Sequence, residues 1–208
     1  MDYAIKAFYP LSQFPRIETV CKEWQTIQKE MWALNAPVLD IDRFNKTHQE
    51  VEKEIDDIYK KTGQYGWVQG GPPTSNGKES WQQYGLIAFG KPVSGAIKTM
   101  PNTLTLLEPI QKHIKVCALN TLKADTLIGL HTHLELRFQQ LLQAHITLDA
   151  PTEDNFAYLN VNGEFFQHHN GASAIFDGSL PHFAVNASQQ DRTILYMEFS
   201  RRGLKEKI

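Results

Sequence analysis

The chain has 208 residues and a formal net charge of −2, with 41% hydrophobic and 21% charged residues. This length and composition are typical of a globular protein with one sizeable domain. Basic residues gather only in the short tail 201–207, which argues against nucleic acid as a partner.

The cysteine content and the hydropathy pattern exclude two further classes. Cys21 and Cys117 are too few and too far apart for a disulfide framework, so a reducing compartment is expected. No apolar run approaches the roughly 18 residues of a membrane span, and the first residues lack the apolar core of a signal peptide. The sequence therefore predicts a cytoplasmic protein without a membrane partner, and it leaves the oligomeric state open.

The N-terminal part, residues 1–113, is expected to be the helical and loop-rich part of one domain that spans residues 1–208. Apolar residues at spacings of three and four predict a first helix over residues 14–34. A second amphipathic helix is predicted over residues 46–61, and Gly63 should end it.

Three further elements are expected before residue 114. Glycines and prolines over residues 63–77 predict a surface loop, and residues 81–89 predict a strand. A short third helix should begin near Pro101, with Asn102 or Thr103 as its N-cap.

The pattern changes at residue 114, where short apolar runs begin to alternate with turn signals. The runs cover residues 114–119, 126–131, 136–148, 156–161, 172–176, 183–185 and 193–199. The dipeptides between them favour tight hairpins, namely Asn162-Gly163, Asn170-Gly171 and Asp177-Gly178. His168 and His169 lie beside one such turn and are expected to be exposed. The sequence predicts an all-β core over residues 114–200, a sandwich, jelly roll or small barrel, with the N-terminal helices packed on it and α+β content overall.

Six of the eight histidines fall in the β half: His131, His133, His145, His168, His169 and His182. A neutral imidazole is the commonest metal ligand near pH 7, although a single buried histidine more often bonds a neighbouring group. His145 and His182 lie on different predicted strands, and Arg192 opens the next strand. A buried arginine is costly unless it is paired, and its planar fork suits a carboxylate. The residues point to a metal and an anionic ligand in one β pocket, while a salt bridge from Arg192 to Asp177 or Glu198 is the alternative.

Several short segments, taken in their order along the chain, carry a family resemblance. They are Trp24 to Glu30, Trp81 to Gly90, Pro101 to Glu108, Thr126 to His131, Ala144-His145, Phe176-Asp177-Gly178-Ser179 with His182 and Asn186, and Arg192. In these motifs the chain resembles the aspartyl/asparaginyl β-hydroxylase family of iron(II)- and 2-oxoglutarate-dependent oxygenases. The core of that family is a double-stranded β-helix, a jelly-roll or cupin-like fold.

The resemblance implies both the ligands and the reaction. His145 and His182 would bind Fe(II), and Arg192 would hold the distal carboxylate of the cosubstrate 2-oxoglutarate. The enzyme would be a dioxygenase that uses O2 to hydroxylate a C–H bond in a small-molecule or peptide substrate. An Asp or Asn residue, or a related amino acid, is the substrate that the family suggests.

The chain departs from the family pattern near the first of these histidines. A carboxylate ligand normally lies two residues after it, where this chain has Thr147, although some members complete the metal shell with water. Asp149 is the nearest acid and a candidate replacement. Gln143 stands where the family often has an arginine. His131 or His133 would compensate, and His131 is expected to contact the cosubstrate or substrate.

Two alternatives from other classes remain open. One is a cupin-like metal-binding or isomerase module that holds zinc, manganese or no metal. The other is a degenerate, metal-free interaction protein, which the threonine at position 147 motivates. Oxygen consumption that depends on 2-oxoglutarate separates the oxygenase from both, and the metal content separates the other two.

Overall fold

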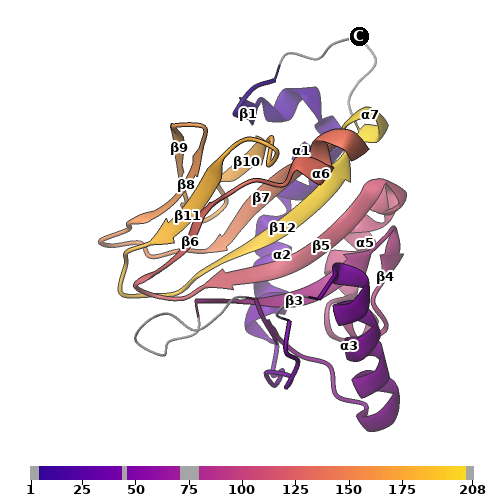
Figure 1. The fold of residues 1–208 in the computed structure, drawn as a ribbon. Coiled ribbons are helices and arrows are strands. Elements are labelled where there is room, and N and C mark those ends of the chain that lie inside the picture. The colour runs from indigo at the N-terminus through magenta and orange to yellow at the C-terminus, as the bar shows by residue number, and fades with distance from the viewer. Residues whose placement is uncertain (1–4, 44–45, 71–79, 205–208) are drawn as a thin grey trace.

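Two facing antiparallel sheets form the core of the computed structural model, which describes residues 5–43, 46–70 and 80–204 (Figure 1). Within these residues, eight strands form the larger sheet, in the order β1-β10-β7-β12-β5-β3-β2 with β4 paired to β3. Its strands are β1 (Phe8–Tyr9), β2 (Val68–Gln69), β3 (Trp81–Ala88), β4 (Lys91–Pro92), β5 (Ile114–Leu122), β7 (Leu141–Asp149), β10 (Ser173–Phe176) and β12 (Arg192–Ser200). The smaller sheet has the order β6-β11-β8-β9, with β6 (Thr126–His131), β8 (Ala157–Val161), β9 (Glu164–Gln167) and β11 (His182–Asn186). The predicted jelly-roll core is confirmed.

One predicted strand is wrong in its first half. The apolar run 136–148 begins as a short helix, α6 (Leu134–Gln139), and only then becomes β7. Gln140 separates the two in a left-handed conformation, with φ 55°. In α6 only Leu136 is buried, so the apolar residues before β7 do not share one strand face. Strand β9 was not predicted.

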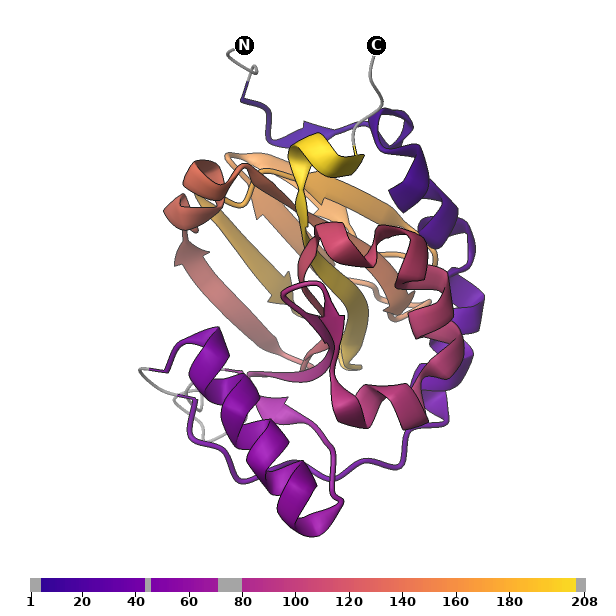
Figure 2. The same cartoon turned by 90° about the vertical axis from the view of Figure 1, so that its right-hand side faces the viewer.

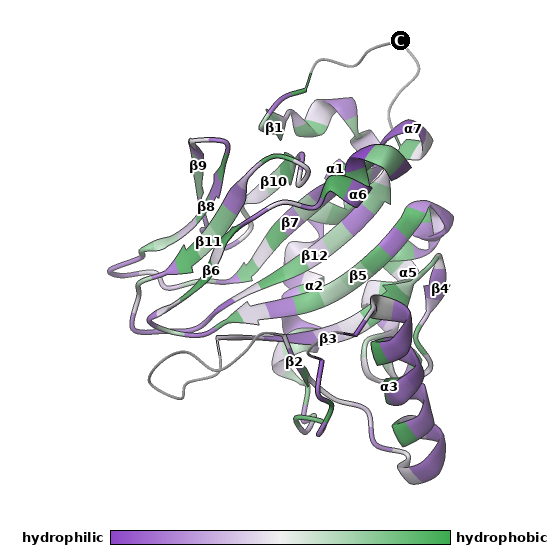
Figure 3. Cartoon of the chain, viewed as in Figure 1, coloured by the Kyte–Doolittle hydropathy of each residue, from purple (hydrophilic) through white to green (hydrophobic). Residues whose placement is uncertain are grey.

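The helices before β2 follow their local signals, with one interruption. The predicted helix 14–34 is two helices, α1 (Pro15–Lys22) and α2 (Trp24–Trp32), separated at Glu23. The predicted helix 46–61 is α3 (His48–Thr62). Thr47 and Glu50 form a reciprocal capping box at its start, and Gly63 ends it with φ 71°. The hydrophilic colour dominates α3 in Figure 3, as expected for a helix with one solvent-facing side.

A helix begins at Pro101 as expected, but its cap differs from the prediction. Asn102 and Thr103 lie inside α5 (Pro101–Leu107), which follows α4 (Ser94–Thr99). The carboxylate of Glu30 in α2 accepts the backbone N–H groups of Asn102 and Thr103 at 2.9 and 2.7 Å. It also accepts the Asn102 amide and the Thr103 hydroxyl, so a distant acid satisfies the start of α5. The remaining elements are η1 (Leu11–Gln13), η2 (Glu108–His113) and α7 (Arg201–Leu204).

Helices α1 and α2 cover one face of the larger sheet and run along one side of the sandwich in Figure 2. Gln28 of α2 donates to the carbonyl of Leu148 at 2.5 Å. On β12, Leu195, Met197 and Phe199 pack in the core on this helix side. The alternate β12 residues Arg192, Ile194, Tyr196 and Glu198 therefore point to the opposite face, between the sheets.

The N-terminal part also contributes strands, because β1 to β4 extend the larger sheet. Residues 71–79 of the predicted surface loop lie outside the described residues. Within the ranges that are described, no helix is both long enough and apolar enough to cross a membrane.

Candidate metal and ligand site

A cavity of about 430 Å³ opens between the two sheets. The smaller sheet and the loop after β6 contribute His131, His133 and His182, and the larger sheet contributes Gln143, His145, Arg192, Tyr196 and Glu198. The N-terminal part adds Arg43, Lys46, Trp81 and Gln83 on another wall. The cavity therefore combines imidazoles, cations and amides within one concave site, as ligand pockets commonly do.

Three histidines form a cluster at this cavity. One ring nitrogen each from His131, His133 and His182 lies within 4.8 Å of the other two. The ring centroids of His131 and His182 are 4.2 Å apart, and that of His133 is 4.9 Å from the first and 5.5 Å from the second. Two metal–imidazole bonds span about 4 Å. The three nitrogens would therefore have to move closer together to share one ion.

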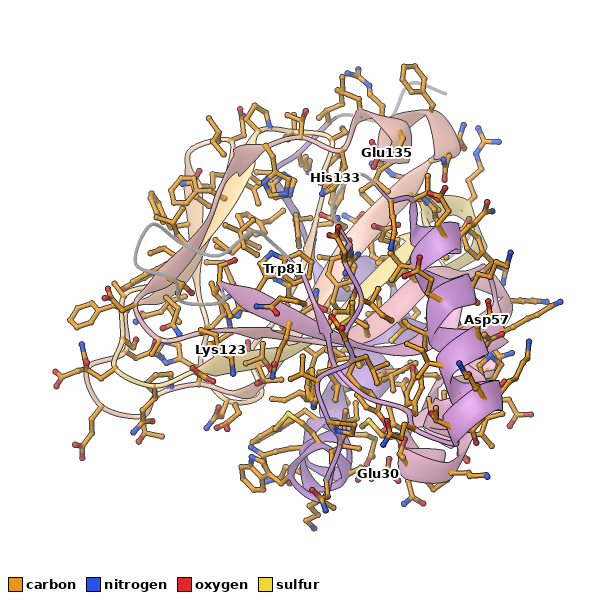
Figure 4. All side chains as sticks on the ribbon, turned by 60° about the horizontal axis from the view of Figure 1, so that its bottom comes forward. Glu30, Asp57, Trp81, Lys123, His133 and Glu135 are labelled. Atoms are coloured by element: carbon orange, nitrogen blue, oxygen red, sulfur yellow. The ribbon has the colours of Figure 1, made fainter. Side chains whose placement is uncertain are left out.

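The hydrogen bonds of these rings fix which nitrogen is available. Nδ1 of His131 lies 2.7 Å from the Gly129 carbonyl, and Nδ1 of His182 lies 2.8 Å from the Leu180 carbonyl. Nδ1 of His133 lies 3.1 Å from the Glu135 carboxylate, and the two side chains are labelled next to each other in Figure 4. Because these oxygens only accept, each Nδ1 carries a proton, and Nε2 is the ring nitrogen left for a metal. Metal-binding histidines are held by this kind of outer hydrogen bond.

Burial keeps two of these rings neutral. It lowers the pKa of His131, and it lowers that of His182 to about 4, with a smaller contribution from the neighbouring histidines. Neutral imidazole is the form that ligates a metal. Protons therefore compete at His182 only well below neutral pH.

A β-bulge turns His131 into the cavity. In the pairing of β6 with β11, His131 lies opposite His182, while Ile128 lies opposite Ala184. Between these two pairs the chain advances three residues along β6 but only two along β11. The extra residue in β6 lets both Ile128 and His131 line the cavity. In a regular strand, residues three apart face opposite sides.

Arg192 lines the same cavity as this cluster but lies on the opposite sheet. It is the first residue of β12 and is only 2% exposed. Burial lowers the pKa of its guanidinium to about 10, and its buried Nε has no hydrogen-bond partner within the described part of the chain. Neither suggested acid pairs with it: Asp177 accepts from Ser179, and Glu198 accepts from Tyr196 and contacts Lys115. The guanidinium is therefore a buried cation at the cavity wall.

His145, which the resemblance implies as a ligand with His182, lies outside the histidine cluster. It lies on β7 of the larger sheet, with its ring 5.7 Å from His168, 4.8 Å from Phe176 and 5.8 Å from Tyr196. It lines the cavity, and its buried Nδ1 has no partner among the described residues. Burial, and then the charge of Arg192, hold its pKa well below the usual range. It is a neutral wall residue beside the cluster.

The search for an acid near His145 is corrected. The hydroxyl of Thr147 lies 2.9 Å from Nδ1 of His168, which is buried and not exposed as predicted, whereas His169 is exposed. Asp149 accepts the indole N–H of Trp32 at 3.3 Å, at the helix side of β7.

The position two residues after His131, not after His145, holds the third member of the cluster. His133 thus follows His131 at the two-residue spacing that was expected between His145 and a carboxylate, and the spacing His131-Thr132-His133 is the signal that could have identified it.

A buried hydrogen-bond chain completes the wall next to His145. The Gln143 amide donates to the Tyr196 hydroxyl at 2.6 Å, and that hydroxyl donates to Glu198 at 2.7 Å. Lys115 lies 3.5 Å from the same carboxylate. Burial and the Glu198 charge hold the pKa of Tyr196 well above its usual range, so the phenol stays protonated.

Comparisons with known proteins found solved structures and a sequence family that resemble this chain. Among solved structures, an oxidoreductase of the 2OG-Fe(II) oxygenase family from Burkholderia pseudomallei is 12% identical with a TM-score of 0.47, and the match covers 84% of this chain and 100% of that chain. A predicted oxalate decarboxylase from Thermotoga maritima is 15% identical with a TM-score of 0.39, covering 59% of this chain and 83% of the other. No curated protein matches the sequence significantly. The sequence model described as aspartyl/asparaginyl beta-hydroxylase matches residues 21–202, and the chain therefore belongs to the aspartyl/asparaginyl β-hydroxylase family.

Proposed function

We propose that this protein is an iron(II)- and 2-oxoglutarate-dependent oxygenase that hydroxylates a C–H bond. The observation that carries the proposal is the meeting of two features in one cavity. Three imidazoles have ring nitrogens within 4.8 Å of one another, and their Nδ1 atoms are bonded elsewhere, so Nε2 is the nitrogen left for a metal. A buried guanidinium without a described acidic partner lies on the facing sheet. The family of the chain supports the same reaction.

The donor set fits a ferrous ion. His131, His133 and His182 would hold it through Nε2, and imidazole nitrogen is a suitable ligand for iron. Three protein ligands leave positions for a cosubstrate and for O2. Iron bound there would supply the activation of O2 that hydroxylation requires.

The chain's own residues would bind and orient the cosubstrate. Arg192, still charged at neutral pH with a pKa of about 10, would bind the distal carboxylate of 2-oxoglutarate through its planar fork. Ile128, Leu159 and Ile194 also line the cavity and would exclude water around the bound acid. His145 would contact the acid between the cluster and Arg192 as a neutral side chain, in place of the ligand role expected from the sequence.

The substrate proposed is an Asp or Asn residue, or a related amino acid, as a small molecule or within a peptide. Family membership supports this choice. Arg43 and Lys46 also line the cavity and bring positive charge to it, although Arg43 donates to Gln83 and Lys46 is paired with Glu54.

One observation favours a second candidate. Three imidazoles with no carboxylate in the cluster would also suit a cupin-like metal enzyme or metal-binding module that works without 2-oxoglutarate. A metal-free interaction protein is the third possibility, and it requires that the cluster bind no ion.

Anaerobic reconstitution with Fe(II) tests the proposal. The purified protein is titrated with 2-oxoglutarate, and oxygen consumption and succinate formation are then followed with and without the cosubstrate. If the protein is an oxygenase, we expect one iron per chain and oxygen consumption that requires 2-oxoglutarate. The His182→Ala variant should lose both the bound iron and the oxygen consumption. Tight metal binding without 2-oxoglutarate binding would favour the cupin-like candidate, and absence of any bound metal would favour the interaction protein.

A further inference from the structure

The turn formed by Asp177, Gly178, Ser179 and Leu180 holds two of the three clustered histidines. It connects β10 to β11. The Gly178 carbonyl accepts the backbone N–H of His133 at 2.9 Å, and the Leu180 carbonyl accepts Nδ1–H of His182 at 2.8 Å. We infer that this turn positions the histidine cluster, and that Gln143 on the cavity wall fixes the place of the turn through its contact with Gly178. The inference rests on the proposed metal site.

The turn is braced from within. One carboxylate oxygen of Asp177 accepts the backbone N–H of Ser179 at 3.0 Å and its hydroxyl at 2.6 Å. The N–H of Leu180 returns to the Asp177 carbonyl at 3.1 Å, and both Asp177 and Ser179 are buried. The two carbonyls that hold the histidines therefore belong to one stiff unit, and a displacement of the turn would move His133 and His182 together.

The orientation of the Gln143 amide follows from its neighbours. The single hydroxyl proton of Tyr196 is donated to Glu198, so the hydroxyl oxygen must accept from Gln143. This places Nε2 of Gln143 toward Tyr196 and Oε1 on the other side. Gln143 is 1% exposed, so the amide has little room to turn.

Oε1 of Gln143 reaches the space that a side chain at position 178 would need. A Cβ atom on Gly178 would lie 2.1 Å from Oε1 and 2.6 Å from Cδ of Gln143, which is far inside normal contact distance. Gly178 does not have a positive φ, so the need for glycine here comes from this contact and not from the backbone. The turn thus packs directly against Gln143, the first member of the hydrogen-bonded series Gln143, Tyr196 and Glu198 in the cavity wall.

The metal site should therefore respond to a change at Gly178 that touches no ligand. Gly178→Ala must displace either the turn or the amide, and both histidine-holding carbonyls move with the turn. Partners of metal ligands typically change metal affinity by about 10- to 100-fold when they are altered. Removal of the Gln143 side chain creates room for the new methyl group, so it should restore the position of the turn.

Co(II) titration provides the test, since the absorption spectrum of bound Co(II) reports its ligand geometry. Four proteins are compared: the wild type, Gly178→Ala, Gln143→Ala and the double variant Gly178→Ala/Gln143→Ala. We expect Gly178→Ala to bind Co(II) about 10- to 100-fold more weakly with an altered spectrum, and the double variant to recover most of the affinity and the wild-type spectrum.

Gly203→Ala is the matched control. Gly203 lies in α7, away from the histidine cluster, and also lacks a positive φ. A Cβ atom on Gly203 would lie 2.2 Å from Nδ1 of His113. This variant should lose stability while its Co(II) affinity and spectrum stay unchanged. If Gly178→Ala does not fold, Ser179→Ala removes one brace without adding atoms and should weaken Co(II) binding in the same direction.

Two outcomes would overturn the inference while the metal site stands. One is wild-type Co(II) affinity in Gly178→Ala, and the other is a double variant that remains as weak as Gly178→Ala. A wild-type protein that binds no Co(II) would instead remove the proposed metal site, and this inference with it.

Discussion

Replacement of Arg192 by methionine separates a ligand-binding role from a structural one. The guanidinium is 2% exposed, and burial lowers its pKa from 12.5 to about 10. Lowering the pKa to about 10 corresponds to an unfavourable free energy of roughly 3 kcal/mol for burying the charge. Within the described residues no acid offsets this cost, because Asp177 and Glu198 are bonded elsewhere.

Arg192→Met should therefore have opposite effects on stability and binding. The free energy of unfolding of the metal-free protein should rise, by up to roughly 3 kcal/mol, because an apolar chain replaces a buried charge. The affinity for 2-oxoglutarate should fall by a factor of about 10 to 150, since a hydrogen bond to a charged group contributes roughly 1.5–3 kcal/mol.

Two assays measure these effects on the same protein. Urea unfolding gives the stability of the metal-free chain, and calorimetric titration of 2-oxoglutarate into the Mn(II)-loaded protein gives the affinity. Arg201→Met is the control, because Arg201 donates to the Tyr9 hydroxyl at 2.9 Å and lies over that ring, away from the cavity. It should lower stability and leave the affinity unchanged. A destabilised Arg192→Met with unchanged affinity would refute the reasoning and make Arg192 structural.

Three further predictions follow from the contacts described. Mn(II) binding, measured by metal analysis after gel filtration, should be lost in His182→Ala but kept within a few-fold in His145→Ala; equal losses would return His145 to the ligand set. Glu30→Ala should lower the free energy of unfolding by about 2 kcal/mol, because the start of α5 loses charged hydrogen bonds, and urea unfolding measures this while Mn(II) affinity serves as the control. Burial lowers the pKa values of His145 and His168 far below that of an unfolded histidine, about 6.5. The unfolded chain therefore binds more protons below about pH 6.5, so the metal-free protein should lose stability as pH falls through this range. Thermal unfolding at pH 7.5 and 5.5 tests it, and His168→Gln should reduce the difference; an equal loss in both proteins would contradict the assignment.

The sequence predicted the elements whose signals are local. The strand at residues 126–131 and the helix ended by Gly63 were found because alternation, caps and left-handed glycines act within a few residues. The run 136–148 failed because an apolar stretch does not distinguish a short helix from a strand when only Leu136 is buried in its first half. Helices α1 and α2 each bury one face, and the apolar spacing of three and four residues continues across Glu23. The periodicity therefore did not reveal the break between them.

The site was predicted in part. The orientation of Arg192 into the cavity follows from alternation along β12, which the sequence carries. The position of His131 does not, because it depends on a bulge in the β6–β11 pairing, and that irregularity is a property of two strands together. The cap that Glu30 provides for α5 is also invisible to local reasoning, since more than seventy residues separate the partners.

The histidines and the arginine lie on different sheets, and this arrangement relates ligand size to the packing of the whole domain. His131 and His182 belong to β6 and β11, and Arg192 belongs to β12. Facing sheets pack about 10 Å apart, a separation that the side chains between them determine. If the proposed diacid binds across the cavity, the side chains between the sheets would determine which length of diacid reaches both the histidine cluster and Arg192. Enlarging or shrinking Ile194 or Leu159, which line the cavity, should change which chain length of diacid binds best.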